Sequence, residues 1–187
     1  LSTSDFSWAA VGPIPKEANL NPTEQINIHN IPLPSLPPWL GIDRALGALA
    51  AFRKSKRSSN ISSGLIIADA GTILSLTRIN SKGEFEGGQL LPGLSLQIEA
   101  MTSRVNTLND PGPINKSPDL FPKQTHLAMQ RGALQALIGT LIQAEKDTNM
   151  QLWICGGDSG LLVNELKKYN VKADHYPNLV LEGMIEL

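Results

Sequence analysis

Cysteine is nearly absent from this chain, and its scarcity excludes two kinds of site. The 187 residues include a single cysteine, Cys155, so neither an internal disulfide nor a CxxC metal motif can form. Proteins of reducing compartments have little use for disulfides. We therefore expect a cytoplasmic protein in which Cys155 is a buried, unreactive thiol at the end of an apolar strand.

The sequence also lacks an excess of one charge and a long apolar run. The 16 basic and 17 acidic side chains leave a formal net charge of -1, which gives no field to recruit nucleic acid or an anionic membrane. No apolar run reaches the roughly 20 residues that cross a bilayer. The one basic run, Arg53–Arg57, follows an apolar helical pattern, so we interpret it as a solvated helix end or loop rather than a nucleic-acid patch. We expect no nucleic-acid partner and no membrane partner.

The first 39 residues are rich in proline and predict little regular structure. Proline fixes φ and disfavours helix in the residue before it. We expect one short strand at Ser7–Val11 and irregular chain elsewhere. The chain starts with no basic and apolar signal segment. Because it begins at Leu1 rather than Met, we expect a fragment, or a chain that lacks ordered N-terminal residues.

The rest of the chain alternates between helical and strand patterns, which predicts an α/β domain. In the longest expected helix, Gly132 and Gly139 would allow close approach of another helix. The expected elements, in chain order, are a helix at 43–53, strands at 64–69, 72–79 and 84–91, a helix at 94–105, a long loop at 106–123, a helix at 125–147, a strand at 151–155, a helix at 159–169, a strand at 173–176 and a helix at 178–186.

Two glycine turns at the ends of buried strands are candidates for a ligand site. In Asp69-Ala70-Gly71-Thr72, glycine lets backbone N–H groups approach a phosphate, the threonine hydroxyl can donate, and the carboxylate can hold a cation. Gly156-Gly157-Asp158 leads into a helix N-terminus, which favours anions. Taken alone, the first turn is more typical of an ordinary β-turn than of a phosphate site. Ser159 follows the second turn, but no GxSxG elbow is present and no histidine partner is indicated.

Two further segments carry chemistry. Gly87 and Gly88 lie inside the third expected strand, where glycine costs stability and indicates close approach of a ligand or of another backbone. Gly41-Ile42-Asp43-Arg44 opens the first expected helix. Asp43 can accept a proton from a substrate hydroxyl, as a kinase requires of its base, and Arg44 can bind a carboxylate through two hydrogen bonds. The alternative for this segment is a helix cap with a local ion pair.

The order of these motifs resembles that of type III pantothenate kinases, the CoaX or Bvg-accessory-factor-like family. Single motifs are weak signals, but their order and combination are specific, and the resemblance covers roughly residues 39–187. The segments that match are Gly41–Arg44 (GxDR), Asp69–Thr72 (DxGT), Gly87-Gly88 with Pro92-Gly93 (GGxIxPG), Thr125 with Gly132, Gly156–Asp158 (TGGD) and Leu179–Met184 (LxLEGL).

The resemblance implies an α/β, actin-like ATPase (ribonuclease H-like) fold, with a mixed sheet that contains an antiparallel meander and is flanked by helices. Residues 1–57 would be the remainder of the N-terminal actin-like half, ending in the GxDR helix, and residues 58–187 the C-terminal half. It also implies phosphorylation of pantothenate by ATP with Mg²⁺, the first step of coenzyme A biosynthesis. A monovalent cation, K⁺ or NH₄⁺, and a homodimer with substrate and cation sites near its interface are further implications.

The same resemblance implies a role for each matching residue. Asp43 would be the catalytic aspartate that activates the pantothenate hydroxyl, and Asp69 would bind the monovalent cation. The other implied contacts are Gly41, Ile42, Arg44 and Thr125 with pantothenate, together with Asp43, and Gly71, Thr72, Gly156 and Gly157 with ATP.

The chain departs from the family pattern near its start. The family opens with a DxGNT phosphate hairpin, which this sequence does not contain, and Pro32–Pro38 stands where the family has a tyrosine upstream of GxDR. Ile73 and Leu74 replace the small residues that commonly follow DxGT. The leading hypothesis is a pantothenate kinase whose first hairpin lies upstream of Leu1. The alternatives are a degenerate, non-enzymatic accessory or regulatory protein, and another actin-like phosphotransferase or acyl-phosphate enzyme with a different acceptor.

Overall fold

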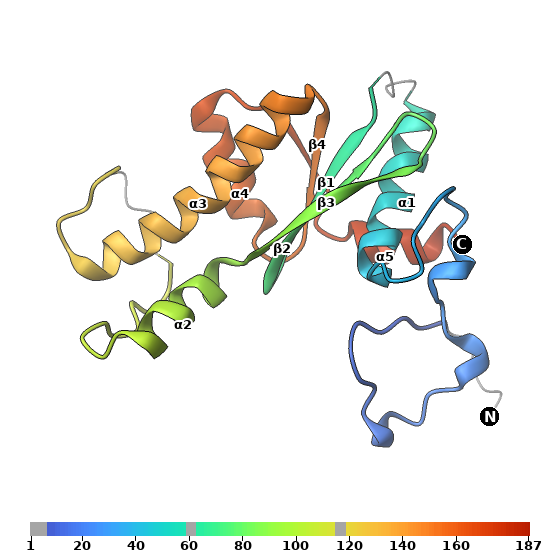
Figure 1. Cartoon of the computed structure of the whole chain (residues 1–187), viewed down its shortest axis with the longest axis horizontal. Helices are drawn as coiled ribbons and strands as arrows, with labels where there is room; N and C mark the ends of the chain where they lie inside the picture. Colours follow the sequence, from blue (N-terminus) through green and yellow to red (C-terminus); the bar gives the residue numbers. More distant parts are fainter. Residues whose placement is uncertain (1–6, 59–62, 115–118) are drawn as a thin grey trace.

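A five-stranded sheet with helices on both faces forms the centre of the protein (Figure 1). The computed structural model describes residues 7–58, 63–114 and 119–187. The strands are β1 (Leu65–Ala70), β2 (Ile73–Ile79), β3 (Phe85–Pro92), β4 (Gln151–Cys155) and β5 (Ala173–His175), and the α-helices are α1 (Ile42–Arg57), α2 (Leu94–Arg104), α3 (Thr125–Thr148), α4 (Ser159–Leu166) and α5 (Leu179–Ile185). Four 3-10 helices lie at Lys16–Ala18, Pro22–Glu24, Ile28–Asn30 and Lys167–Tyr169.

The strand order is β3-β2-β1-β4-β5. β1, β2 and β3 form an antiparallel meander, whereas β4 lies parallel to both β1 and β5. Parallel neighbours need long crossover connections, and here helices supply them. A meander continued by parallel strands in this order is the topology of an actin-like half, so the predicted fold class is confirmed.

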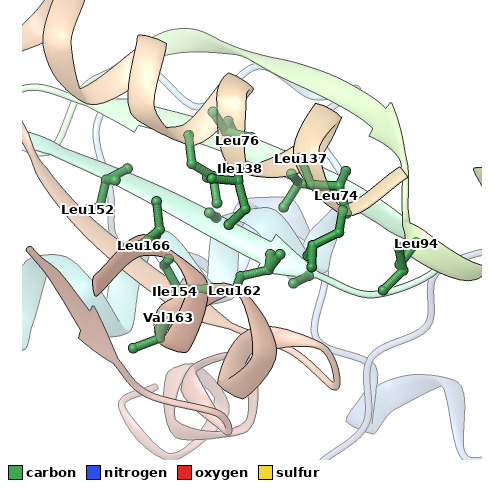
Figure 2. Packing of buried hydrophobic residues seen from close by; sticks show 14 of the residues in the cluster. Leu74, Leu76, Leu94, Leu137, Ile138, Leu152, Ile154, Leu162, Val163 and Leu166 are labelled. Carbon is green, nitrogen blue, oxygen red and sulfur yellow. The ribbon is translucent and has the colours of Figure 1, made fainter. Parts of the chain in front are cut away.

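The side chains of each central strand alternate between two cores, one on each face of the sheet. Ile66 and Ala68 of β1 face a core shared with α2, α3 and α4, while Leu65 and Ile67 face a core shared with α1 and α5. Figure 2 shows the first core, where side chains of α3 and α4 meet those of β2 and β4. The sheet therefore separates α1 from α3.

The basic run forms the last turn of α1 and is bound to α5. Arg57 and Arg53 both contact Glu186, and Lys54 lies 2.9 Å from a carboxylate oxygen of Glu182. Hydrogen bonds from Arg57 hold the pKa of the Glu186 carboxyl below its usual value. The interpretation of this run as a helix end is confirmed.

The N-terminal segment contains no strand at Ser7–Val11, so that prediction was wrong. Trp8 makes only an isolated bridge with Gln25, because the chain beyond it turns away at a stretch where Pro13 and Pro15 have no N–H to donate. Trp8 is nevertheless buried, and its indole N–H donates to the carbonyl oxygen of Asn21 at 2.9 Å.

Gly183 lets α5 pack directly against the backbone of α1. A Cβ atom built on Gly183 would lie 2.2 Å from the carbonyl oxygen of Leu46. α1 and α5 together cover that face of the sheet and share its core; the predicted division of the chain between residues 57 and 58 stays a prediction. Gly132 and Gly139 do not serve such a contact, contrary to expectation: both are exposed, and no described atom lies within 4 Å of a Cβ built on either.

We expect Gly183→Ala to lower the free energy of unfolding by about 1–3 kcal/mol, because the added methyl group overlaps the Leu46 carbonyl. Gly139→Ala is the matched control, since its methyl group meets open space and alanine favours a helix over glycine by about 0.5–1 kcal/mol. Urea unfolding of both variants measures the two changes. A loss of stability in Gly139→Ala as large as in Gly183→Ala would contradict this packing.

Candidate functional site

The two glycine turns meet at one edge of the sheet. In the parallel β1–β4 pair, Asp69 lies in register with Cys155, so the turns that follow both strands leave the sheet side by side. The backbone N–H of Asp158 donates to the carbonyl oxygen of Ala70 at 3.0 Å. This hydrogen bond joins the second turn to the first.

A cavity of about 250 Å³ lies between these turns and the start of α2. Three of the four predicted ATP contacts, Gly71, Thr72 and Gly157, line it, whereas Gly156 does not. The full set of lining residues is Ala70, Gly71, Thr72, Ser95, Leu96, Glu99, Gly157 and Asp158.

The cavity offers several hydrogen-bond donors. Within residues 7–58, 63–114 and 119–187, the amide and hydroxyl of Thr72 and the amide of Gly157 donate to no protein atom. The first-turn N–H groups of α2, at Ser95 and Leu96, have no intrahelical acceptor, and a helix N-terminus favours negative charge. This set of donors suits the oxygens of a phosphate group.

Ser95 and Glu99 line the cavity but were not predicted site residues, and Asp158 was predicted as part of the second turn without a contact of its own. The available signal was Gly93, immediately before the helical pattern: a Cβ there would lie 2.1 Å from the carbonyl oxygen of Gly71, so the start of α2 fits against the first turn only with glycine. Burial raises the pKa of the Asp158 carboxyl. Two carboxylates beside a phosphate repel it unless a cation shields them, which is consistent with a cation-bound polyphosphate.

Asp69 lies at the same edge, on the α1 face of the sheet. Burial raises the pKa of its carboxyl, the nearby charge of Asp43 raises it further, and a hydrogen bond from the Cys155 thiol lowers it. The structure thus brings the predicted catalytic and cation-binding aspartates close together. Burial also raises the pKa of Cys155, which agrees with the unreactive thiol that we expected.

The start of α1 presents the predicted acceptor residues. Gly41 is the N-cap, and Asp43 lies in the first turn, where its Oδ1 accepts a hydrogen bond from the Arg44 amide at 2.8 Å. A Cβ on Gly41 would lie 2.6 Å from this same oxygen, so glycine leaves the carboxylate uncrowded. Ile42 packs at the margin of the α1 core.

Arg44 reaches across to the meander. Its Nε donates to the Thr77 hydroxyl at 2.9 Å and its Nη2 to the carbonyl oxygen of Leu76 at 3.1 Å. A Cβ on Gly88 would lie 2.3 Å from that Nη2 and 2.1 Å from the Leu76 oxygen. The glycine inside β3 is therefore needed because another backbone and the Arg44 side chain approach it closely.

Thr125 is the one predicted substrate contact that lies apart from the others. It is exposed at the first position of α3, and α3 covers the face of the sheet opposite α1 (Figure 1). A single copy of the chain does not bring Thr125 to Asp43.

Ser159 has a histidine partner, so the expectation that it has none was wrong. Its Oγ lies 3.0 Å from Nε2 of His175. The parallel pairing of β4 with β5 places His175 beside Ile154, near the turn in which β4 ends. No local spacing signals this contact, because it depends on which strand lies next to β4.

Within the described residues, no three His, Cys, Asp or Glu side chains gather in a way that could hold a metal ion. No helix in that part of the chain has the length and hydropathy to cross a membrane.

The raised pKa of Asp69 predicts a pH-dependent effect of Asp69→Asn. A carboxyl whose pKa is higher in the folded state contributes stability below its unfolded pKa of about 4, and this stability is lost as pH rises through the folded pKa. At neutral pH the charged Asp69 therefore costs stability that asparagine would not. In potassium-free buffer we expect Asp69→Asn to melt above the wild type at pH 7.5, with the difference shrinking towards pH 4.5.

Thermal unfolding across this pH range measures the effect, and Asp110→Asn, in an exposed loop, is the control. A melting-temperature difference that stayed constant with pH, or grew as the pH fell, would contradict the burial of a charged Asp69.

Comparisons with known proteins agree with the motifs. Residues 23–145 match the sequence model of type III pantothenate kinases. The chain is 33% identical over 188 residues to a type III pantothenate kinase of Synechococcus sp. (strain JA-3-3Ab), covering 94% of this chain and 72% of that one. It is 31% identical over 159 residues to one of Rhodopirellula baltica, covering 82% of this chain and 56% of the relative.

A solved structure agrees as well. The crystal structure of a conserved Baf-family protein from Campylobacter jejuni superposes with a TM-score of 0.62 at 26% identity, covering 91% of this chain and 75% of that one. Motif order, strand topology and these comparisons lead to the same conclusion: the chain belongs to the type III pantothenate kinase family.

Proposed function

We propose that this chain carries the acceptor site and one phosphate-binding side of an ATP-dependent kinase that converts pantothenate to 4'-phosphopantothenate, the first step of coenzyme A biosynthesis. The observation that carries the proposal is the convergence of three segments at one sheet edge. The start of α1, with Asp43, the turn after Asp69, and the turn at Gly157 all lie there, and the family is named for this reaction.

The cavity between the two turns suits the phosphates of ATP. The amide of Gly157, the amide and hydroxyl of Thr72 and the first turn of α2 provide donors, and Gly71 allows the backbone to come close. Gly156 would act by shaping the turn rather than by contact. Mg²⁺ bound with ATP would neutralise charge on the triphosphate and on the carboxylates of Asp158 and Glu99.

Asp43 is the residue that would accept the proton of the pantothenate hydroxyl as the phosphoryl group is transferred. Kinases gain most of their rate from positioning and charge stabilisation, and the first turn of a helix fixes Asp43 well. Arg44 is held by Thr77 and Leu76 and has further N–H groups for the pantothenate carboxylate. Gly41 and Ile42 would border the same acceptor.

Asp69 is the proposed ligand of a monovalent cation, K⁺ or NH₄⁺. The fit rests on its surroundings: among the described residues, this half-buried carboxylate beside a second aspartate has a thiol as its one side-chain donor. A cation there would offset the cost of burying that charge. It would also reduce the repulsion between Asp69 and Asp43.

We also propose a homodimer. The dimer would have a role in binding because α3 lies apart from α1. A second copy of the chain would bring its own Thr125 to the pantothenate held at Asp43. The sheet blocks this contact within one copy.

Asp43→Asn tests the acceptor site. In the complete gene product, assayed with ATP, Mg²⁺, K⁺ and pantothenate, we expect kcat to fall about 10²- to 10⁴-fold, because a general base contributes a factor of this size. The melting temperature should change little. Asp147→Asn, on the exposed side of α3, is the control and should keep full activity. Full activity of Asp43→Asn would show that the assigned base is wrong.

Thr72→Ala tests the nucleotide side. Loss of one hydroxyl donor is expected to raise KM for ATP roughly 3- to 10-fold, as expected for about 1 kcal/mol, while KM for pantothenate stays unchanged. Thr72→Ser keeps the hydroxyl and should behave like the wild type. Equal KM values for ATP in Thr72→Ala and the wild type would remove Thr72 from the ATP site.

A further inference from the structure

Ser159 is buried behind the second glycine turn and connects it to β5. It is 2% exposed, and both its amide and its hydroxyl donate to the carbonyl oxygen of Gly156, at 3.2 Å and 2.6 Å. The hydroxyl has one proton, which the shorter contact with Gly156 uses. His175 Nε2, 3.0 Å from the Ser159 Oγ, must then be the donor in their hydrogen bond.

The carbonyl that Ser159 holds belongs to the same planar peptide group as the N–H of Gly157. In a trans peptide these two groups point in opposite directions. Fixing the Gly156 oxygen towards Ser159 therefore aims the Gly157 N–H away from it. That N–H donates to no protein atom within the described ranges, and Gly157 lines the cavity.

Without the Ser159 hydroxyl, the longer hydrogen bond from the Ser159 amide would be the one bond to a described residue that holds this carbonyl. Gly156 has a φ of +88°, and glycine populates both signs of φ at similar cost. Contacts with β1 fix the two ends of the turn: a Cβ on Gly156 would lie 2.4 Å from Asp69 Oδ1, and the Asp158 amide is bonded to Ala70. The orientation of the peptide plane between Gly156 and Gly157 is then set by the hydrogen bonds that Ser159 donates to the Gly156 carbonyl.

We propose that Ser159 and His175 are positioning residues that aim the Gly157 N–H at a phosphate of the nucleotide. This inference rests on the proposed function, which identifies the ligand as a nucleotide. Neither side chain lines the cavity, so both act only through the peptide. His175 is exposed and the Ser159 hydroxyl is not part of the cavity lining, so substitutions at these two residues leave the cavity wall intact.

The test uses four variants of the complete gene product. Ser159→Ala removes the hydroxyl, His175→Ala removes its donor, and His175→Gln restores an N–H near the position of Nε2. Ser103→Ala is the matched control, because the Ser103 hydroxyl also donates to a carbonyl three residues before it, that of Ala100, at 3.2 Å and away from the cavity lining. Titration calorimetry measures ATP binding, and steady-state assays measure the KM values.

We expect Ser159→Ala and His175→Ala to weaken ATP binding and raise KM for ATP about 2- to 10-fold, the size of one net hydrogen bond. KM for pantothenate should not change, and His175→Gln and Ser103→Ala should match the wild type. Unchanged ATP affinity in His175→Ala, or equal losses for both substrates, would overturn the proposal. Because His175 is exposed, its variants should fold, and they decide the test even where Ser159→Ala fails to fold.

The two proposals fail in different ways. A wild type that binds ATP without phosphorylating pantothenate would refute the proposed reaction, while the ATP affinities of the variants would still decide the role of Ser159 and His175. A wild type without ATP binding would overturn both.

Discussion

The parallel pairing of β1 with β4 is the constraint on which the candidate site depends. These strands are far apart in the sequence, and their register sets Asp69 opposite Cys155. Parallel strands end at the same edge of a sheet, so each delivers its glycine turn to one place. The hydrogen bond from Asp158 to Ala70 and the cavity between the turns exist only because this pairing holds.

Alternation along β1 then assigns each function to a face. Asp69 shares the parity of Leu65 and Ile67, so it lies on the side of α1 and Asp43. Ala70 belongs to the other core, beneath α2 and α3. A slip of one residue would exchange the two faces and separate the aspartates. The register that packs the cores is thus the same one that builds the acceptor side of the proposed kinase.

Glycine does a different job at each point where elements converge. Gly88 leaves room for the Arg44 side chain and the backbone of Leu76. Gly93 lets the start of α2 contact the Gly71 turn, and Gly156 lets the second turn contact Asp69. In each case the atom that excludes a side chain comes from a distant part of the chain. These three glycines are therefore required by contacts between elements.

The sequence by itself determined the elements and the family. Periodicity is a local property, so the helices and strands from residue 42 onwards lie close to where the apolar pattern predicts them, and the order of short motifs identified the relatives that the comparisons found. Only the tertiary structure decided what those elements do to one another. The strand expected at Ser7–Val11 found no partner strand, Gly139 faces open space while Gly183 touches α1, and Ser159 meets His175. Each outcome depends on which distant segments come together, and a local pattern of residues does not encode that.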